Sequence, residues 1–524
     1  MSRLRIPKHR IPRISEMIST LRQKPASLFL LLGVYFIVQV LVRLALPASL
    51  ELDEGQQLYY AQWLSIGYDS QPPFYNWIQY GVVELLGPNR LALALLKNLM
   101  LFASYVLIAL AAAQVLKSRD LVIIACLSLL TMPQISFEAQ RDLTHTVALI
   151  FCTALLLFGV LRTLKSPSRW SYALTGAAIG CGFISKYNFV LLVSAAFLAI
   201  LAEPKFRRRV MDWRILLTAG VALAILLPHA LWFFQHMQEA TRNTLGKMTD
   251  DNITSLPQQI FKGLTSLSTA VLASAAPTMA LLLIPFARTL PFPHLPRPAA
   301  SVLSASNEWT RLLGRMMLLV VAVLALMVIF GGVSAIKDRW LAPCFLMLPL
   351  YLCLKVEAAG LGEEGQLRRF LVVALAIMVL VPVILYGRVV GAGIIGHYQK
   401  QNVPYGQAVA TALASAPSRP VLVLTSDQQM AGNIRLHAPD IAVTVPPTSG
   451  VPAPARFDAQ HPLMVIWRNF GRPNPEMPKA MKDWIATYPG LQAQSVGEIA
   501  LPFLHGRPHS LYSFGYALYY STTP

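Results

Sequence analysis

The chain has 524 residues, of which 55% are hydrophobic and only 13% are charged. Soluble domains carry roughly a quarter charged residues, so the composition excludes a soluble enzyme and indicates a polytopic membrane protein. The net charge of +19 does not indicate nucleic-acid binding, because much of the excess lies in short loops between apolar runs, as the positive-inside rule predicts.

The chain begins with a basic, proline-interrupted segment, residues 1–25, which is predicted to be cytoplasmic. The apolar run after it is too long for a signal-peptide core and is expected to remain as the first transmembrane helix. Continuous runs of about 20 apolar residues exclude a β-barrel, whose alternating strands are about 10 residues long. Eleven spanning helices are predicted, at residues 26–46, 91–116, 119–133, 143–161, 171–185, 188–203, 214–234, 264–287, 315–332, 339–355 and 370–390.

The positive charges test the orientation of these spans. With the N-terminus inside, the inner segments are residues 3–24, 117–119, 162–169, 205–214, 288–315 and 355–369, and they hold more than half of the 44 Lys and Arg residues. The outer loops are much poorer in positive charge. This asymmetry predicts a multi-pass membrane protein with its N-terminus in the cytoplasm.

The composition changes after the last predicted span. Residues 391–524 are rich in proline and polar residues, and short strand-like runs occur at 420–425, 441–445 and 463–467. We therefore predict a transmembrane domain at residues 26–390, followed by a domain of the α/β or α+β class on the outer side of the membrane.

The first outer loop, residues 47–90, carries the adjacent acidic pair Asp53-Glu54. Residues 53–66 and 74–86 are each predicted to form a helix lying along the membrane surface. Because a carboxylate can accept the proton of an attacking hydroxyl group, Asp53 is the predicted general base. The alternative is that Asp53 only caps the helix that follows it.

Other polar residues are predicted on the same outer side of the membrane. They are Gln56 and Gln71 in the first loop, Lys97 in the second span, Arg141, Asp142 and His145 between the third and fourth spans, Lys186 and Tyr187 between the fifth and sixth, and Lys337 and Arg339 between the ninth and tenth. Ionisable groups near membrane depth tend to mark functional sites. The basic side chains are expected to hold phosphate oxygens, with snorkelling at helix ends as the alternative. Arg141 and Asp142 can also form an ion pair with each other.

These motifs, taken together, resemble those of the GT-C membrane glycosyltransferases. The motifs are Asp53-Glu54, Pro72-Pro73, Arg141-Asp142, Ser185-Lys186-Tyr187-Asn188 and Lys337-Asp338-Arg339-Trp340-Leu341-Ala342-Pro343. Within that class, residues 25–390 are similar to the protein mannosyltransferase and aminoarabinose transferase superfamily, and most similar to bacterial lipid A and core galacturonosyltransferase-like proteins.

The resemblance implies an all-α GT-C fold in the bacterial inner membrane, with the C-terminal domain in the periplasm. It also implies inverting transfer of a sugar from a polyprenyl-phosphate donor to an acceptor such as lipid A or lipopolysaccharide. It places the catalytic carboxylate at Asp53, with Glu54 beside it, and donor-phosphate binding at Lys186, Lys337 and Arg339. Some members of the class use a divalent metal, for which Glu54 and His145 are candidate ligands.

The chain departs from the aminoarabinose transferases at Gln56 and Gln71, where those enzymes carry Arg and Lys. Phosphate binding is then expected to shift to Lys97, Arg141 or Lys186. Three alternatives remain open from the sequence: a transporter or flippase for a lipid-linked sugar, a polysaccharide polymerase or ligase, and a transferase with a protein acceptor.

Overall fold

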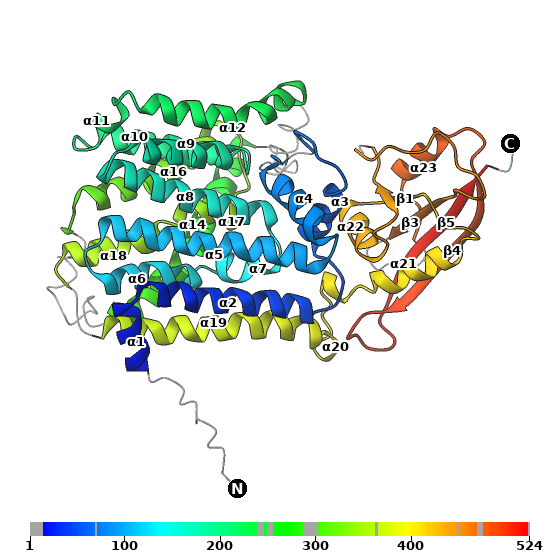
Figure 1. Cartoon of the computed structure of the whole chain (residues 1–524), viewed down its shortest axis with the longest axis horizontal. Helices are drawn as coiled ribbons and strands as arrows, with labels where there is room; N and C mark the ends of the chain where they lie inside the picture. Colours follow the sequence, from blue (N-terminus) through cyan, green and yellow to red (C-terminus); the bar gives the residue numbers. More distant parts are fainter. Residues whose placement is uncertain are drawn as a thin grey trace, which may run out of the picture.

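The computed structural model describes residues 14–68, 71–237, 246, 248, 255–286, 302, 304–361, 365–447, 450–468 and 475–521. Residues 1–13 of the predicted basic N-terminus lie outside these ranges. Figure 1 shows a bundle of long helices beside a smaller sheet domain, with α3 (Leu52–Tyr60) and α4 (Phe74–Leu86) at their junction.

The helical bundle is built from the apolar runs of the sequence. Asn89, Ser168 and Asn307 each cap the helix that follows by accepting a hydrogen bond from a backbone N–H of its first turn. The helices of the bundle are α1 (Ile14–Gln23), α2 (Pro25–Ala45), α5 (Arg90–Val115), α6 (Arg119–Leu127), α8 (Thr144–Lys165), α9 (Arg169–Phe183), α10 (Phe189–Leu201), α11 (Arg207–Val210), α12 (Ile215–Gln235), α14 (Leu256–Phe286), α16 (Glu308–Phe330), α17 (Asp338–Phe345), α18 (Leu348–Ala358) and α19 (Gln366–Val390).

Seven of the described helices are long and apolar enough to cross a membrane, or up to nine if each of two bent helix pairs is one span. All of these coincide with spans predicted from the sequence. The other two predicted spans, 171–185 and 188–203, correspond to α9 with 15 residues and α10 with 13. Both helices are shorter than the roughly 20 residues of a full span, so the count of eleven stays a prediction.

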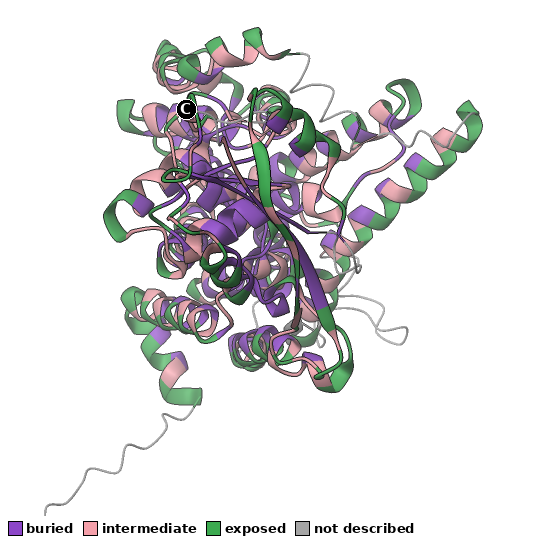
Figure 2. Ribbon diagram, turned by 90° about the vertical axis from the view of Figure 1, so that its right-hand side faces the viewer, coloured by how far each residue is buried: buried purple, intermediate pink, exposed green. Residues whose placement is uncertain are grey.

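The bundle exposes apolar side chains on its outer faces, as lipid contact requires. Leu30, Ile37 and Leu41 of α2 are all exposed. Figure 2, seen from the end that carries the sheet domain, shows a buried centre with exposed residues around the periphery.

Two of the spans are broken at proline. After α6 and η1 (Ser128–Thr131), the chain turns by 68° into the π-helical turn η2 (Gln134–Glu138) and α7 (Ala139–Arg141), while α17 and α18 meet at 41°. Pro133 precedes η2 and Pro349 lies in the first turn of α18, and proline removes a backbone donor from a helix. The π-helical turn brings Gln134 and Glu138 to the wall of a cavity.

The two helices of the first outer loop differ in their surroundings. α4 has the predicted bounds, whereas α3 ends at Tyr60, before the predicted end at residue 66. Most side chains of α3 are buried, because α22 (Gln428–His437) packs across it. The sheet domain therefore covers one face of α3, and the position of this helix along the membrane surface stays a prediction.

The C-terminal part contains a five-stranded mixed sheet in the order β2 (Ala442–Thr444), β1 (Leu422–Thr425), β3 (Leu463–Arg468), β5 (Leu511–Tyr520), β4 (Gln492–Pro502). The pairs β2–β1 and β1–β3 are parallel, and β3–β5 and β5–β4 are antiparallel. Side chains alternate along β3, so Met464 and Ile466 lie in one core with α21 (Tyr405–Ala414) and α22, and Leu463 and Val465 in another with α23 (Lys479–Ala486). The short helices α20 (Ala392–Ile395) and η3 (Lys400–Asn402) connect α19 to this domain.

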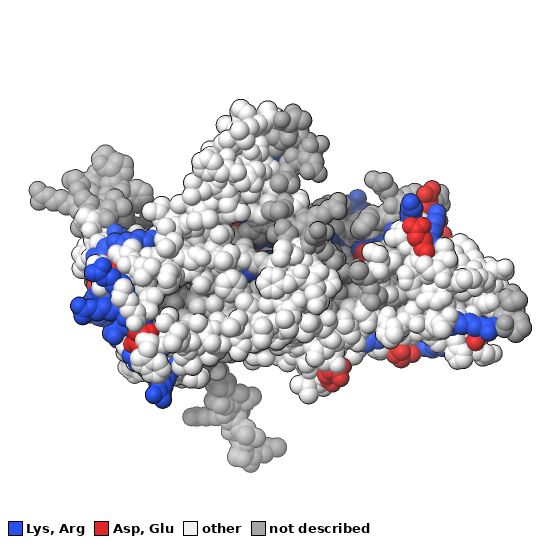
Figure 3. Space-filling model, turned by 90° about the horizontal axis from the view of Figure 1, so that it is seen from above, with Lys and Arg blue, Asp and Glu red and all other residues white. Residues whose placement is uncertain are grey.

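Charge divides the molecule along its length. Figure 3 shows Lys and Arg gathered at the end of the bundle opposite the sheet domain, with a largely uncharged middle. The helix α11, which contributes Arg207, Arg208 and Arg209, lies at that end (Figure 1).

Candidate functional site

Asp53 lies at the start of α3 with its side chain half-buried. Its Oδ2 accepts a hydrogen bond from the backbone N–H of Thr144, 3.0 Å away at the start of α8. The alternative interpretation, that Asp53 only caps the helix that follows it, is wrong, because Glu51 and Glu54 form the capping box of α3. Among the described residues, no hydrogen bond reaches the second carboxylate oxygen of Asp53.

Asp142 forms a second hydrogen bond with Asp53, this time to its backbone. Its Oδ1 accepts the backbone N–H of Asp53 at 3.0 Å. Leu143, between Asp142 and Thr144, has a φ of 68°, a left-handed conformation that is strained for a residue with a side chain. This turn allows Asp142 and the N–H of Thr144 to bond the same residue on α3.

Glu54 lies in a buried ion cluster. Arg43 Nη2 is 2.8 Å from its Oε2, and Lys97 Nζ is 3.4 Å from its Oε1. Burial raises the pKa of Glu54, but the charges of Arg43 and Lys97 outweigh burial and lower it to about 2. Glu54 is therefore an ionised counter-ion, and both of its oxygens are already occupied.

Lys97 is enclosed by this ion cluster. Its Nζ also donates to the carbonyl oxygen of Gln140 at 3.3 Å. The cavity beside it, bounded also by Arg43, Arg141 and Arg388, has a volume of about 20 Å³. This is enough for roughly one water molecule and too small for a phosphate group.

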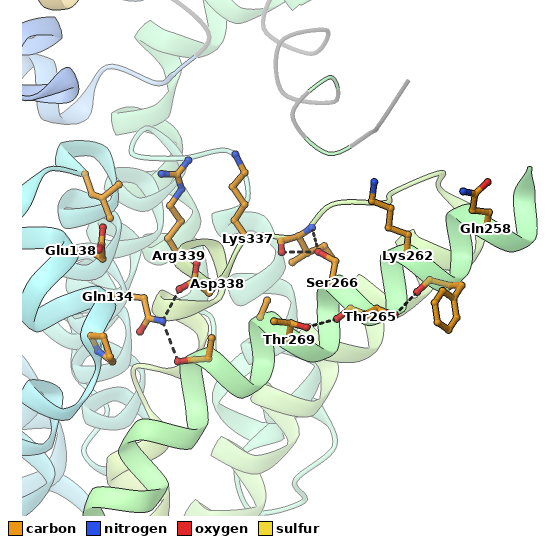
Figure 4. Close-up of a pocket in the computed structure, with 16 residues that line it drawn as sticks. Gln134, Glu138, Gln258, Lys262, Thr265, Ser266, Thr269, Lys337, Asp338 and Arg339 are labelled. Carbon is orange, nitrogen blue, oxygen red and sulfur yellow. Dashed lines mark hydrogen bonds between the residues drawn. The ribbon is translucent and has the colours of Figure 1, made fainter. Parts of the chain in front are cut away.

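A much larger cavity, of about 990 Å³, lies between α14, α17 and the π-helical turn. Figure 4 shows Lys262, Lys337 and Arg339 extending on the same side of the ribbon that forms its wall. Glu138 and Asp338 also line it, and Asp338 is fixed by a hydrogen bond of 2.9 Å from Gln134. The remaining lining residues are Pro133, Leu143, Gln258, Phe261, Thr265, Ser266, Thr269, Ala270, Ala273 and Ile336. Such a wall suits a ligand with an anionic group and an apolar part.

Asp53 is connected to this cavity through the strained turn. Asp53 does not line the cavity itself, but Leu143 does, and the two neighbours of Leu143 are the residues that bond Asp53. The Asp53 carboxylate, one oxygen of which has no partner among the described residues, is thus linked by this turn to a cavity lined by three cations.

The remaining predicted site residues have other partners. Arg141 does not pair with Asp142, because its Nη2 is 2.7 Å from Glu138 Oε2. Lys186 donates to Thr146 of α8 at 2.9 Å. The hydroxyl of Tyr187 is 3.2 Å from Nε2 of His229. Gln56 donates a hydrogen bond of 2.6 Å to Gln428 of the sheet domain, and Gln71 is half-buried just before α4.

Comparison with known proteins identifies the family. A family model described as dolichyl-phosphate-mannose-protein mannosyltransferase matches residues 70–232. The lipopolysaccharide core galacturonosyltransferase RgtB of Rhizobium johnstonii is 43% identical over 490 residues, covering 94% of this chain and 97% of RgtB. RgtA of the same organism, which carries the same description, is 42% identical and covers 93% of this chain and 96% of its own. The chain belongs to this family of GT-C glycosyltransferases.

The fold agrees with this assignment. The crystal structure of ArnT from Cupriavidus metallidurans bound to undecaprenyl phosphate superposes with a TM-score of 0.60 at 13% identity, covering 94% of this chain and 97% of ArnT. The resemblance inferred from the motifs is confirmed. This transferase is a multi-pass membrane protein that acts on envelope glycans.

The two candidate metal ligands of the transferase do not form a metal site. Glu54 is engaged by two cations, and His145 Nε2 lies 3.2 Å from Nε2 of Gln57. Within the described ranges, no group of three or more His, Cys, Asp or Glu side chains is arranged to hold a metal ion.

Three residues of the transferase site were missed by the sequence interpretation. Arg43 lies within the first predicted span, and a cation in an apolar helix is itself a signal of a buried partner. Lys262 lies within α14, close to its N-terminal end, and lines the large cavity. Thr144 contributes only its backbone N–H, so its side-chain type carries no signal.

Proposed function

We propose that this transferase moves a uronic acid from a polyprenyl-phosphate donor to a sugar of the lipopolysaccharide core, with inversion at the anomeric carbon. The observation that carries the proposal is the difference between two adjacent carboxylates. Asp53 keeps one oxygen without a described partner beside a cationic cavity, whereas Glu54 is fully engaged by Arg43 and Lys97.

The proposed reaction uses Asp53 as the general base. Its Oδ2 is held by the N–H of Thr144, which leaves Oδ1 to take the proton of the acceptor hydroxyl. The hydroxyl oxygen forms a bond to the anomeric carbon as the bond from that carbon to the phosphate oxygen breaks. The electron pair leaves with the polyprenyl phosphate, and the proton stays on Asp53 until solvent removes it.

The large cavity is the proposed donor site. Negative charge grows on the phosphate as it leaves, and the cations Lys262, Lys337 and Arg339 stabilise that charge. A uronic acid adds a second anionic group, and the three cations outnumber the two carboxylates, Glu138 and Asp338, that also line the cavity. The names of RgtB and RgtA support galacturonate as the sugar and the lipopolysaccharide core as the acceptor.

The charge distribution supports a periplasmic site. Basic residues gather at the end of the bundle opposite the sheet domain (Figure 3), and such residues face the cytoplasm in membrane proteins. The cavity-lining segment 337–339, the acidic pair and residues 391–524 would then face the periplasm. A transporter is less well supported, because the relatives are named as transferases.

The test is transfer from a polyprenyl-phosphate galacturonate donor to core lipopolysaccharide by the purified Asp53→Asn variant. Asn keeps an oxygen for the N–H of Thr144 but accepts a proton poorly. We expect turnover to fall about 100- to 10,000-fold, the range of general-base contributions. Asp120→Asn, which alters an acidic residue paired with Arg22 on α1, is the control and should retain turnover. Wild-type turnover by folded Asp53→Asn would remove Asp53 as the base.

A further inference from the structure

The sheet domain touches the helix that carries Asp53 backbone to backbone. A Cβ added to Gly432 of α22 would lie 2.0 Å from the carbonyl oxygen of Gly55. A Cβ added to Gly55 would lie 2.7 Å from Cα of Gln429. Glycine on both helices is therefore required for α3 and α22 to approach this closely.

Hydrogen bonds fix the chain on the N-terminal side of α3 to the same domain. The backbone N–H of Leu50 donates to Asn433 Oδ1 and its carbonyl oxygen accepts from Gln429 Nε2, each at 2.9 Å. The Ser49 hydroxyl donates to the carbonyl oxygen of Val403 at 2.6 Å. All of these groups are buried, so the bonds are protected from water.

The C-terminal side of α3 is held in the same way. Gln62 bonds both backbone groups of Val443 in β2, at 3.1 Å and 2.9 Å. Tyr59 and Tyr60 lie in the hydrophobic core of the sheet domain, and the Tyr60 hydroxyl accepts from Gln428 at 2.7 Å. Two side chains of α3 are thus core residues of a domain that lies more than 300 positions away in the chain.

We propose that the sheet domain is a clamp that sets the position of the Asp53 carboxylate, with Gly55 and Gly432 as positioning residues. The proposal rests on the proposed function of Asp53. A helix of nine residues is not stable on its own in water, so α3 depends on what it packs against. The membrane helices hold Asp53 and Glu54, and the sheet domain holds the opposite face and both flanks.

The separation of α3 and α22 sets how far the Asp53 carboxylate can move, and its effect on the rate can be measured. A Cβ contact of 2.0 Å is relieved only if α3 and α22 separate. Misplacement of a reacting group by about 1 Å costs about 100-fold in rate. Apart from Leu143, the donor cavity is lined by segments that do not bond α3, so its affinity for the donor should change much less than kcat with the position of α3.

The experiment compares full-length Gly432→Ala and Gly55→Ala with Gly220→Val. Gly220 is exposed on α12 and has no atom within 4 Å of an added Cβ, so its variant controls for added bulk. We expect kcat to fall about 100-fold in both alanine variants with donor KM within about threefold of wild type. Hydrogen exchange should quicken in α3 and stay unchanged in β1 and β3. Gly220→Val should behave as wild type.

Wild-type kcat in both alanine variants would overturn the clamp, and so would a lowered kcat with unchanged exchange in α3. If Gly432→Ala also loosens β1 and β3, Gly55→Ala decides, because its substitution lies outside the domain. Inactive Asp53→Asn beside fully active Gly432→Ala would reject the clamp alone. Active Asp53→Asn beside inactive alanine variants would reject Asp53 as the base and leave a clamp on α3.

Discussion

Asp53 and Asp142 are linked through two hydrogen bonds, in each of which one carboxylate accepts a backbone N–H at the start of a helix. The Asp53 carboxylate accepts the N–H of Thr144 at the start of α8, and the Asp142 carboxylate accepts the N–H of Asp53 at the start of α3, both at 3.0 Å. Two neighbouring carboxyl groups are thus held together by backbone N–H donors at two helix starts. The arrangement links the first outer loop to the broken span more rigidly than either bond alone.

Asp142→Asn should reduce the pH dependence of stability. Burial raises the pKa of Asp142 well above its ordinary value, and the nearby charges of Asp53 and Glu51 raise it further. A carboxyl with a raised pKa stabilises the fold most below its unfolded pKa and loses that contribution as pH rises through the folded pKa. Asn keeps the oxygen for Asp53 and does not titrate, so its melting temperature should fall less on the alkaline side.

Thermal melts of purified wild type and Asp142→Asn, from acidic to alkaline pH, test this difference in melting temperature. Asp142→Ala is the companion variant, because it leaves the N–H of Asp53 without its acceptor and should lower the free energy of unfolding by about 1–3 kcal/mol. An alkaline decline of the same size in wild type and Asp142→Asn would show that Asp142 does not titrate in this way.

Glu54→Gln should destabilise the protein strongly. The substitution leaves Arg43 and Lys97 buried without their counter-ion, and breaking a buried pair from one side costs about 3–5 kcal/mol. Glu84→Gln, on the exposed face of α4, is the control. The comparison uses melting temperature in detergent. Equal melting temperatures for both variants would mean that the ion cluster contributes little.

The acid limit of stability also depends on Glu54. Its pKa of about 2 lies below the ordinary value, so its contribution is present above the unfolded pKa and is lost as pH falls toward 2. Glu54→Gln should lack this part of the acid transition, and titration of unfolding below pH 5 measures it.

Removing a cation from the large cavity should weaken donor binding. Lys262→Gln, Lys337→Gln and Arg339→Gln each delete one charge that faces the cavity. Loss of a charged hydrogen bond of about 1.5–3 kcal/mol corresponds to a rise of roughly tenfold or more in the donor KM. Lys205→Gln, in an exposed pair with Glu308, is the matched control. Unchanged KM in all three variants would place the donor elsewhere.

Local sequence signals predicted part of the fold well. The helix Phe74–Leu86 was predicted with its observed bounds, because Pro72-Pro73 precedes it and Gly87 ends it with a φ of 81°. The predicted helix 53–66 ended early, because Gln62 bonds β2 and Trp63 packs with Tyr59 and Tyr60. No local pattern announces a partner that lies in another domain.

The site was predicted in the same uneven way. Lys337 and Arg339 line the large cavity, and the sequence motif that contains both had singled them out. Lys97 was expected at the donor phosphate but lies beside Glu54, where it adds a second positive charge to the buried pair with Arg43. Such charge balances depend on which helices meet, and a single sequence does not contain that information.

The contact between α3 and the sheet domain also sets the order of biogenesis. Gln56 and Gln428 are 372 positions apart, so α3 reaches its final place only after nearly the whole chain has been synthesised. Contacts between distant positions form late in folding. A nascent or truncated chain would contain the acidic pair and the residues of the cavity, but α3 would not yet be held in position. The enzyme would therefore be inactive until the sheet domain had folded.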